Sequence, residues 1–183
     1  MKKVAVFGKP GSGKSTVSKA LALSTGTPLH QLDSIVYKPN GELVAREVFD
    51  KAHDNILCTD SWIIDGFGPI SSFNKRLEAA DTLVYIDLPY PVSYWFVTKR
   101  FLKGVFIKPE GWPDGSLVLK GTLASYKTLK LCPKFWNDDF MSKLIEKSDS
   151  KDVHVIKTVT ELNNFVLEHV SNTSKTNDYG VNN

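Results

Sequence analysis

The chain has 183 residues, of which 42% are hydrophobic and 23% are charged, a composition that suits one folded domain with a sizeable core. Its 23 lysines and arginines against 20 acidic residues leave a net charge of only +3, too small to indicate nucleic-acid binding. Two cysteines without metal-ligand spacing argue against a disulfide framework or a zinc site, and no apolar run approaches the roughly 18 residues of a membrane span. A glycine-rich stretch soon interrupts the first apolar run, so we expect no signal peptide and a cytoplasmic protein.

The first third of the chain predicts strands and helices in alternation. Residues 3–7 form a short apolar run without polar alternation, which is typical of a strand buried on both faces of a parallel sheet. A helix is expected from about residue 14 to Gly26, and Pro28 prevents its continuation. Three further elements are an apolar segment at 29–32 that ends in Asp33, a loop-like stretch at 34–43 and a helix at 44–57.

The rest of the chain continues the alternation. Strands are predicted at 62–64, closed by Asp65, at 82–88, ended by Pro89, and at 152–156. Thr158 and Glu161 have the spacing of a capping box for a closing helix that ends near Val170. The other helices are expected at 72–80, 92–103, 117–130 and 134–147, and residues 171–183 are polar and turn-rich, which predicts a disordered tail.

This order of elements predicts an α/β fold in which helices cover both faces of a parallel sheet of about five strands. We expect one domain over residues 1–170. Two stretches, at about 34–60 and about 104–116, are interpreted as accessory flaps on that core.

The segment GKPGSGKST at residues 8–16 matches the P-loop pattern G-x-x-x-x-G-K-[ST]. Successive backbone N–H groups of such a loop point at phosphate oxygens, and glycines permit that close approach. The positive end of the following helix adds to the attraction. The alternative is a plain glycine-rich turn, but the preceding buried strand and the following amphipathic helix favour the phosphate-binding reading. The residues assigned to this cradle are Gly8, Pro10, Gly11, Ser12, Gly13, Lys14, Ser15 and Thr16.

The Pro-Gly-Ser-Gly-Lys form of the loop resembles that of the adenylate-kinase-related P-loop kinases. Asp-Gly-Phe-Gly at 65–68 is similar to the Asp-Gly-Phe-Pro-Arg segment of adenylate kinases. The resemblance is strongest to small bacterial proteins called topology modulation proteins, and it covers roughly residues 1–170. It rests on His-Gln-Leu-Asp at 30–33, Trp-Ile-Ile-Asp-Gly at 62–66, the segment 76–89 and Lys99-Arg100.

This resemblance implies a P-loop NTPase three-layer sandwich with a short lid at about 104–116, an acceptor-side insert at about 34–60, and use of ATP with Mg²⁺. In the P-loop template Lys14 is a catalytic cation on the β- and γ-phosphates, and the Ser15 hydroxyl binds Mg²⁺. One departure concerns the acceptor: the phosphate-gripping arginine of adenylate kinases is replaced by Pro69, and Ile70 follows. The chain has only three arginines, Arg46, Arg76 and Arg100, which argues against a monophosphate acceptor.

Two aspartates are predicted at the carboxyl edge of the sheet, where ligands collect in open α/β sheets. Asp65 is interpreted as a ligand of Mg²⁺, directly or through water, on the substrate side of the site; the alternative is a cap on the turn before Gly66. Asp33 is interpreted as a catalytic and substrate-binding residue that takes the proton of an acceptor hydroxyl. Its alternative role is to cap the next element together with Ser34.

Basic residues cluster after residue 98. Lys99, Arg100, Lys103 and Lys108 precede the first acid, Glu110, and in the kinase interpretation they belong to a lid that closes over ATP. Arg100 matches the first lid-helix arginine of the related kinases and is expected to bind ATP and assist catalysis. The alternative is a solvated basic surface.

The remaining candidates face the acceptor. Arg76 is expected to contact the acceptor or, alternatively, to pair with Glu78 or Asp81 on the surface. Phe67, Tyr37, Trp62 and Trp112 are candidates for lining the acceptor pocket, and Trp112, beside Pro113, is the most suggestive of them. The alternative is a place in the core, where aromatic side chains are more often found. The histidines show no metal-ligand spacing.

These patterns predict a kinase that transfers the γ-phosphoryl group of ATP, with Mg²⁺, to a small molecule such as a nucleoside, a nucleotide or another hydroxyl compound. Two alternatives remain: a nucleotide-dependent regulatory or DNA-associated protein, and an ATPase that needs no acceptor. Neither a nucleic-acid partner nor a membrane is expected, and the oligomeric state is left open.

Overall fold

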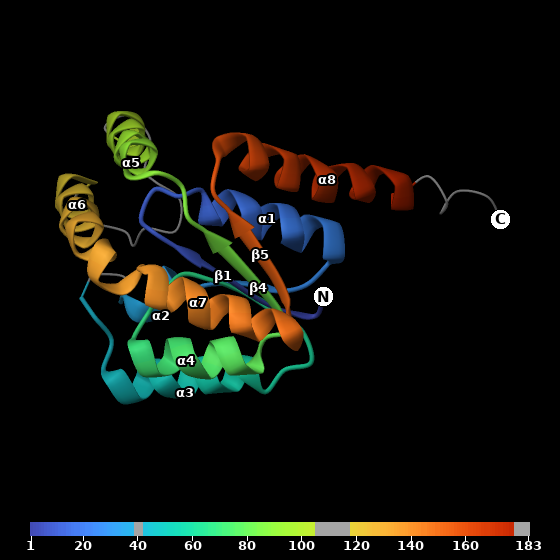
Figure 1. Cartoon of the computed structure of the whole chain (residues 1–183). Helices are drawn as coiled ribbons and strands as arrows, with labels where there is room; N and C mark the ends of the chain where they lie inside the picture. The colour runs from blue at the N-terminus through green and yellow to red at the C-terminus, as the bar shows by residue number, and fades with distance from the viewer. Residues whose placement is uncertain (39–41, 105–117, 178–183) are drawn as a thin grey trace.

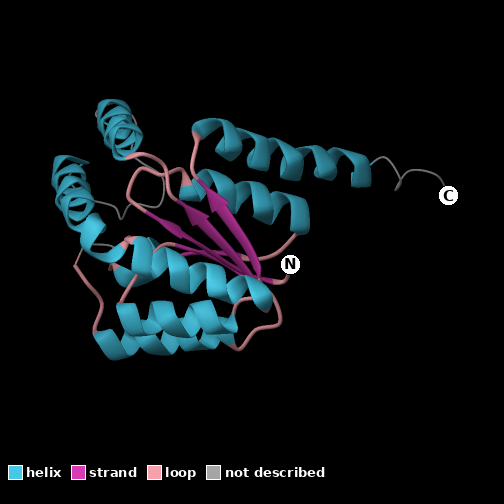
Figure 2. Cartoon of the chain, in the orientation of Figure 1, coloured by secondary structure: helices cyan, strands magenta, loops and turns pink. Residues whose placement is uncertain are grey.

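A computed structural model describes residues 1–38, 42–104 and 118–177. Its centre is a five-stranded sheet with the strand order β2-β3-β1-β4-β5, and every pair of neighbouring strands is parallel. Figures 1 and 2 show the sheet between two layers of helices. The strands are β1 (Lys3–Gly8), β2 (Leu29–Gln31), β3 (Trp62–Asp65), β4 (Thr82–Ile86) and β5 (Asp152–Ile156).

The two faces of the sheet form separate cores because successive side chains of a strand point to opposite faces. On β1, Val4 and Val6 face one core, whereas Ala5 and Phe7 face the other. The first core contains residues of α1 (Lys14–Thr25) and α8 (Val159–Asn177), which Figure 1 shows above the sheet. The second core is rich in aromatic rings and lies against α3 (Arg46–Leu57), α4 (Ile70–Ala79) and α7 (Asp138–Glu146).

The carboxyl ends of the parallel strands meet at one edge of the sheet, and the sequence 8–13 leads from β1, the middle strand, into α1 at this edge. The short helix α2 (Leu32–Val36) follows β2 directly. Two helices lie beyond the same edge, α5 (Tyr90–Gly104) and α6 (Val118–Phe135), and Figure 1 shows them side by side. This edge is therefore where the P-loop and the residues that follow β2, β3 and β4 come together.

Most predicted elements are confirmed, and their ends follow the expected signals. Gly26 ends α1 in the left-handed conformation, with φ of 67°, and its N–H donates to the carbonyl of Ala22. At the start of α8 the N–H of Glu161 donates to Thr158 Oγ1, while the Glu161 carboxylate accepts from the N–H of Lys157.

Three expectations were wrong in detail. Asp33 does not end a strand: β2 stops at Gln31, and Asp33 lies in the first turn of α2, which extends to Val36 into the stretch 34–43 that was expected to be a loop. The helix expected to end near residue 130 continues to Phe135 as α6, because Pro133, in its last turn, removes only one hydrogen bond. The next helix accordingly begins at Asp138, where the Asn137 side chain accepts from the N–H of Phe140.

The predicted tail also begins too early. Helix α8 continues through residues 171–177, since no glycine or proline interrupts the sequence before Gly180. The rest of the tail and the proposed lid, including Lys108, Glu110 and Trp112, lie outside the described residues. None of the described helices is both long enough and apolar enough to cross a membrane.

Candidate active site

The loop between β1 and α1 has the backbone geometry of a phosphate cradle. Gly8 and Gly11 have φ values of 146° and 69°, which L side chains rarely adopt. A Cβ atom on Gly8 would lie 2.3 Å from the carbonyl oxygen of Ile86, and one on Gly11 would lie 2.5 Å from that of Ser93. The loop therefore fits against β4 and α5 only because glycine occupies both positions.

Lys14 and Ser15 open helix α1, where unpaired N–H groups and the helix dipole favour an anion. The Lys14 ammonium donates to the carbonyl of Lys9 over 2.7 Å. Burial lowers the pKa of Lys14, and the nearby carboxylates of Asp65 and Asp33 oppose that shift. Lys14 thus lies inside the loop with two carboxylates close enough to stabilise its charge.

The Ser15 hydroxyl donates to Asp65 Oδ2 over 2.8 Å, so the loop is joined directly to the end of β3. Asp65 is only 6% exposed, and burial raises its pKa, opposed mainly by Lys14 and the Ser15 hydrogen bond. A hydroxyl and one carboxylate fit Mg²⁺ that arrives with a nucleotide, because Mg²⁺ keeps several waters and takes its other ligands from phosphates. Among the described residues, no group of three or more His, Cys, Asp and Glu side chains forms a metal site without a nucleotide.

Asp33 and Arg100 join Lys14 and Asp65 at the same place. Asp33 is exposed, and its charge opposes the lowering of the pKa that burial causes at Lys14 and at Arg100. The guanidinium of Arg100 also donates to Ser125 Oγ on α6 over 2.8 Å. The charges of Asp65, Asp33 and Arg100, from β3, α2 and α5, therefore all act on Lys14 at the carboxyl edge of the sheet.

A second charged pair beside the loop was missed by the sequence analysis. Lys9, only 2% exposed, forms an ion pair with Asp87, which follows β4, and its ammonium lies 4.7 Å from the centre of the Tyr90 ring. Asp87 could have been found by the rule that identified Asp65, since both follow strands at the same edge. The thiol of Cys132 on α6 lies near both loop lysines, and nothing in the sequence indicated this.

Arg76 differs from both predictions. It is fully buried on α4, and its Nη2 donates to the carbonyls of Gly66 and Phe67 over 2.9 and 3.0 Å. It pairs with neither Glu78 nor Asp81: the Glu78 carboxylate bonds to Lys147, and that of Asp81 accepts from the N–H groups of Lys2 and Lys3.

The aromatic candidates separate into different environments. Phe67 is half-buried two residues after Asp65, and its ring contacts Phe135 and Trp136 at centroid distances of 4.7 and 5.3 Å. Trp62 is fully buried and offers no surface to a ligand. Tyr37 is 40% exposed and lies opposite Leu43 in an isolated bridge.

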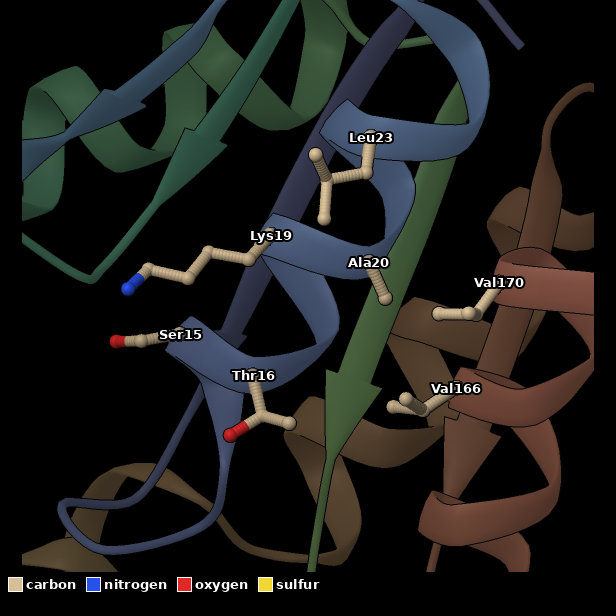
Figure 3. A pocket seen from close by; sticks show the side chains of 7 residues that line it. All are labelled: Ser15, Thr16, Lys19, Ala20, Leu23, Val166 and Val170. Atoms are coloured by element: carbon tan, nitrogen blue, oxygen red, sulfur yellow. The ribbon is translucent and has the colours of Figure 1, made fainter. Parts of the chain in front are cut away.

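Thr16 is an exposed residue in the first turn of α1. An open groove begins there between α1 and α8, and Figure 3 shows Thr16 and Ala20 directed towards Val166 and Val170. Ser12, by contrast, is completely buried within the loop, and its hydroxyl has no partner among the described residues.

Comparisons with known proteins identify the architecture. No protein-family model matches the chain, and no curated protein sequence matches it, so membership of the topology modulation group stays a prediction. A shikimate kinase from Acinetobacter baumannii in complex with shikimate superposes with a TM-score of 0.53 at 12% identity, covering 100% of this chain and 96% of the kinase. A shikimate kinase from Bacteroides thetaiotaomicron gives a TM-score of 0.51 at 12% identity, with 90% and 94% covered.

Identity this low establishes the fold alone. The arrangement of five parallel strands with helices on both faces agrees with those structures. The chain shares the three-layer α/β fold of these two kinases and carries a P-loop motif after its middle strand.

Proposed function

We propose that this protein is a Mg²⁺-dependent kinase that transfers the γ-phosphoryl group of ATP to a hydroxyl group of a small molecule. The observation that carries the proposal is the loop geometry, in which the Lys14 ammonium lies inside the P-loop and the Ser15 hydroxyl donates to Asp65, while the charges of Asp33 and Arg100 act on Lys14. Phosphoryl transfer depends mainly on positioning and on neutralising charge, and this set supplies two cations, a metal-binding oxygen pair and an additional carboxylate.

The roles follow from the chemistry of each group. Lys14 binds the β- and γ-phosphates, and Ser15 with Asp65 holds Mg²⁺, directly or through water. Bound Mg²⁺ supplies neutralisation of phosphate charge. Asp33 accepts the proton of the acceptor hydroxyl, and the oxygen of that hydroxyl forms a bond to the γ-phosphorus. The bond between the γ-phosphorus and the oxygen that bridges it to the β-phosphate breaks, which leaves ADP. Arg100 stabilises the negative charge of the transferring group.

The distribution of arginines favours a hydroxyl acceptor over a nucleoside monophosphate. Of the three arginines of the chain, Arg46 bonds to Asp50 and Ser71, and Arg76 is buried against backbone carbonyls. Only Arg100 adjoins the site with a side chain that is not fully buried, and its charge is balanced by Asp33. A second phosphate would therefore lack the bidentate arginine partners that phosphate recognition ordinarily uses.

The test is a screen of nucleosides, sugars, other polyols and nucleoside monophosphates for stimulated ADP release. We expect a compound with a free hydroxyl and no phosphate to stimulate turnover well above background. Stimulation by monophosphates only would contradict the acceptor assignment. ADP release that no acceptor increases, but that Lys14→Ala abolishes, would identify an ATPase instead.

With the acceptor in hand, Asp33→Asn tests the proton acceptor. The variant keeps the shape of the side chain but cannot take the proton, so kcat should fall by about 10²–10⁴-fold while Mg²⁺–ATP binding stays within a fewfold of wild type. Asp139→Asn is the control, because Asp139 is an exposed carboxylate on α7 that pairs only with Lys143 in the described contacts. Equal kcat in Asp33→Asn and wild type would rule out Asp33 as the base.

A further inference from the structure

Arg76 is the most deeply buried cation near the site, and the proposed chemistry does not use it. Its side chain has no exposed surface, and its guanidinium lies 5.3 Å from the centre of the Phe73 ring. Without accessible surface it cannot touch a substrate. Any contribution to the reaction must therefore pass through the groups it contacts.

Those groups form the turn that follows Asp65. A single nitrogen, Nη2 of Arg76, donates to the carbonyls of Gly66 and Phe67. Gly66 has a φ of 125°, which L side chains rarely adopt. Because glycine has no Cβ atom, the backbone of this turn is less restricted than that of other residues. The carboxylate immediately before this turn accepts the hydroxyl of Ser15. One series of contacts thus leads from Arg76 through the turn to Asp65 and on to Ser15.

Stability alone does not account for an arginine in this place. Its Nε and Nη1 have no hydrogen-bond partner among the described residues, and burial lowers its pKa to about 10. Burying such a cation is costly, and well-packed apolar side chains often replace buried charges without loss of stability. What an apolar side chain cannot supply is a donor that fixes two consecutive carbonyls and a positive charge close to the Asp65 carboxylate.

We propose that Arg76 is a positioning residue that fixes the turn after β3, and through it holds Asp65 beside Ser15 in the arrangement that takes up Mg²⁺ with ATP. The inference rests on the proposed function, because it assigns Asp65 and Ser15 to Mg²⁺. Groups that orient a metal ligand typically contribute about 10–100-fold to metal affinity.

The experiment is calorimetric titration of the purified protein with ATP, in the presence and in the absence of MgCl₂. Wild type, Arg76→Met, Arg76→Lys and Arg46→Met are compared. Arg46 also bonds to α4, through Ser71, but it is exposed and has no contact with the turn among the described residues, so it controls for loss of an arginine that joins α3 to α4.

We expect Mg²⁺ to tighten ATP binding in wild type and in Arg46→Met to the same extent. In Arg76→Met this tightening should fall by about tenfold or more, whereas affinity for ATP without Mg²⁺ should stay within about twofold of wild type. Arg76→Lys keeps the charge but not the planar fork, so its loss should be intermediate. If Arg76 had only a structural role, its replacement would not selectively reduce the increase in ATP affinity that Mg²⁺ causes.

The outcomes separate this inference from the function on which it rests. If wild type shows no Mg²⁺-dependent binding, the proposed function fails. If wild type shows it and folded Arg76→Met retains it fully, only the role of Arg76 is overturned. Should Arg76→Met fail to fold, Arg76→Lys decides by the same measurement, and failure of both variants to fold beside a folded Arg46→Met would assign Arg76 a structural role and also overturn the proposal.

Discussion

His53 is a fully buried residue of α3 that stacks on Phe49 at a centroid distance of 5.8 Å. Neither ring nitrogen has a hydrogen-bond partner among the described residues, and Nδ1 lies 3.7 Å from Asp54. Burial, together with the charge of Arg76, lowers the pKa of His53 below its ordinary value of 6.5. The folded protein therefore contains a neutral histidine that the unfolded chain protonates more readily.

This difference makes stability depend on pH. Below about pH 6.5 the unfolded chain binds a proton at His53 that the folded protein does not, so the free energy of unfolding falls by up to about 1.4 kcal/mol per pH unit until the folded pKa is reached. In His53→Phe, which keeps a ring on Phe49, that part of the decrease between pH 7 and pH 5 should disappear. Urea unfolding of both proteins at several pH values measures it, and parallel curves would show that His53 does not titrate differently in the two states.

At the scale of elements, the P-loop and α1 owe their shape to glycines that serve different purposes. Gly11 and Gly26 have nearly equal φ values, 69° and 67°, but a Cβ atom on Gly11 would collide with α5, whereas one on Gly26 would have nothing within 4 Å. Substitution of Gly26 therefore tests backbone strain alone, whereas substitution of Gly11 adds a steric collision to the same strain.

Gly26→Ala should cost only the strain of a left-handed alanine, about 1–2 kcal/mol, and should leave ATP binding unchanged. Gly11→Ala should destabilise the protein by more than that and weaken Mg²⁺–ATP binding by at least about tenfold, because the loop must move away from Ser93. Thermal unfolding and calorimetry compare the two. Equal ATP affinity in both variants would show that the loop tolerates the displacement.

The elements also show how far local sequence signals extend. The helices and strands with clear periodicity or Gly and Pro boundaries were predicted to within a few residues, as α1 and β5 demonstrate. The apolar run 29–32 predicts a strand that ends at Asp33. This prediction is wrong because the strand has only three residues and a short helix follows it directly. The end expected near residue 130 is wrong because Phe135 and Trp136 pack against Phe73 and Tyr85, and this packing holds the last turn of α6 against the sheet.

At the scale of the whole molecule, the predictable part of the site is the part that is contiguous in sequence or fixed by topology. The P-loop is one uninterrupted motif, and Asp65 follows from the rule that ligands collect at the carboxyl edge of parallel strands. The buried position of Arg76 depends on how α4 packs against the turn that follows β3, and the pairing of Lys9 with Asp87 joins residues 78 positions apart. Such contacts arise from tertiary packing, which periodicity and spacing do not encode.

The central claim is that the loop between β1 and α1 holds a nucleoside triphosphate with Mg²⁺, and calorimetric titration with ATP and MgCl₂ tests it most directly. The account predicts saturable binding by wild type and by Lys143→Ala, which removes an exposed lysine of α7. It predicts binding at least about tenfold weaker in Lys14→Ala, which loses the charged donor inside the loop. Absence of Mg²⁺-dependent binding of both ATP and GTP to the folded wild-type protein would contradict it.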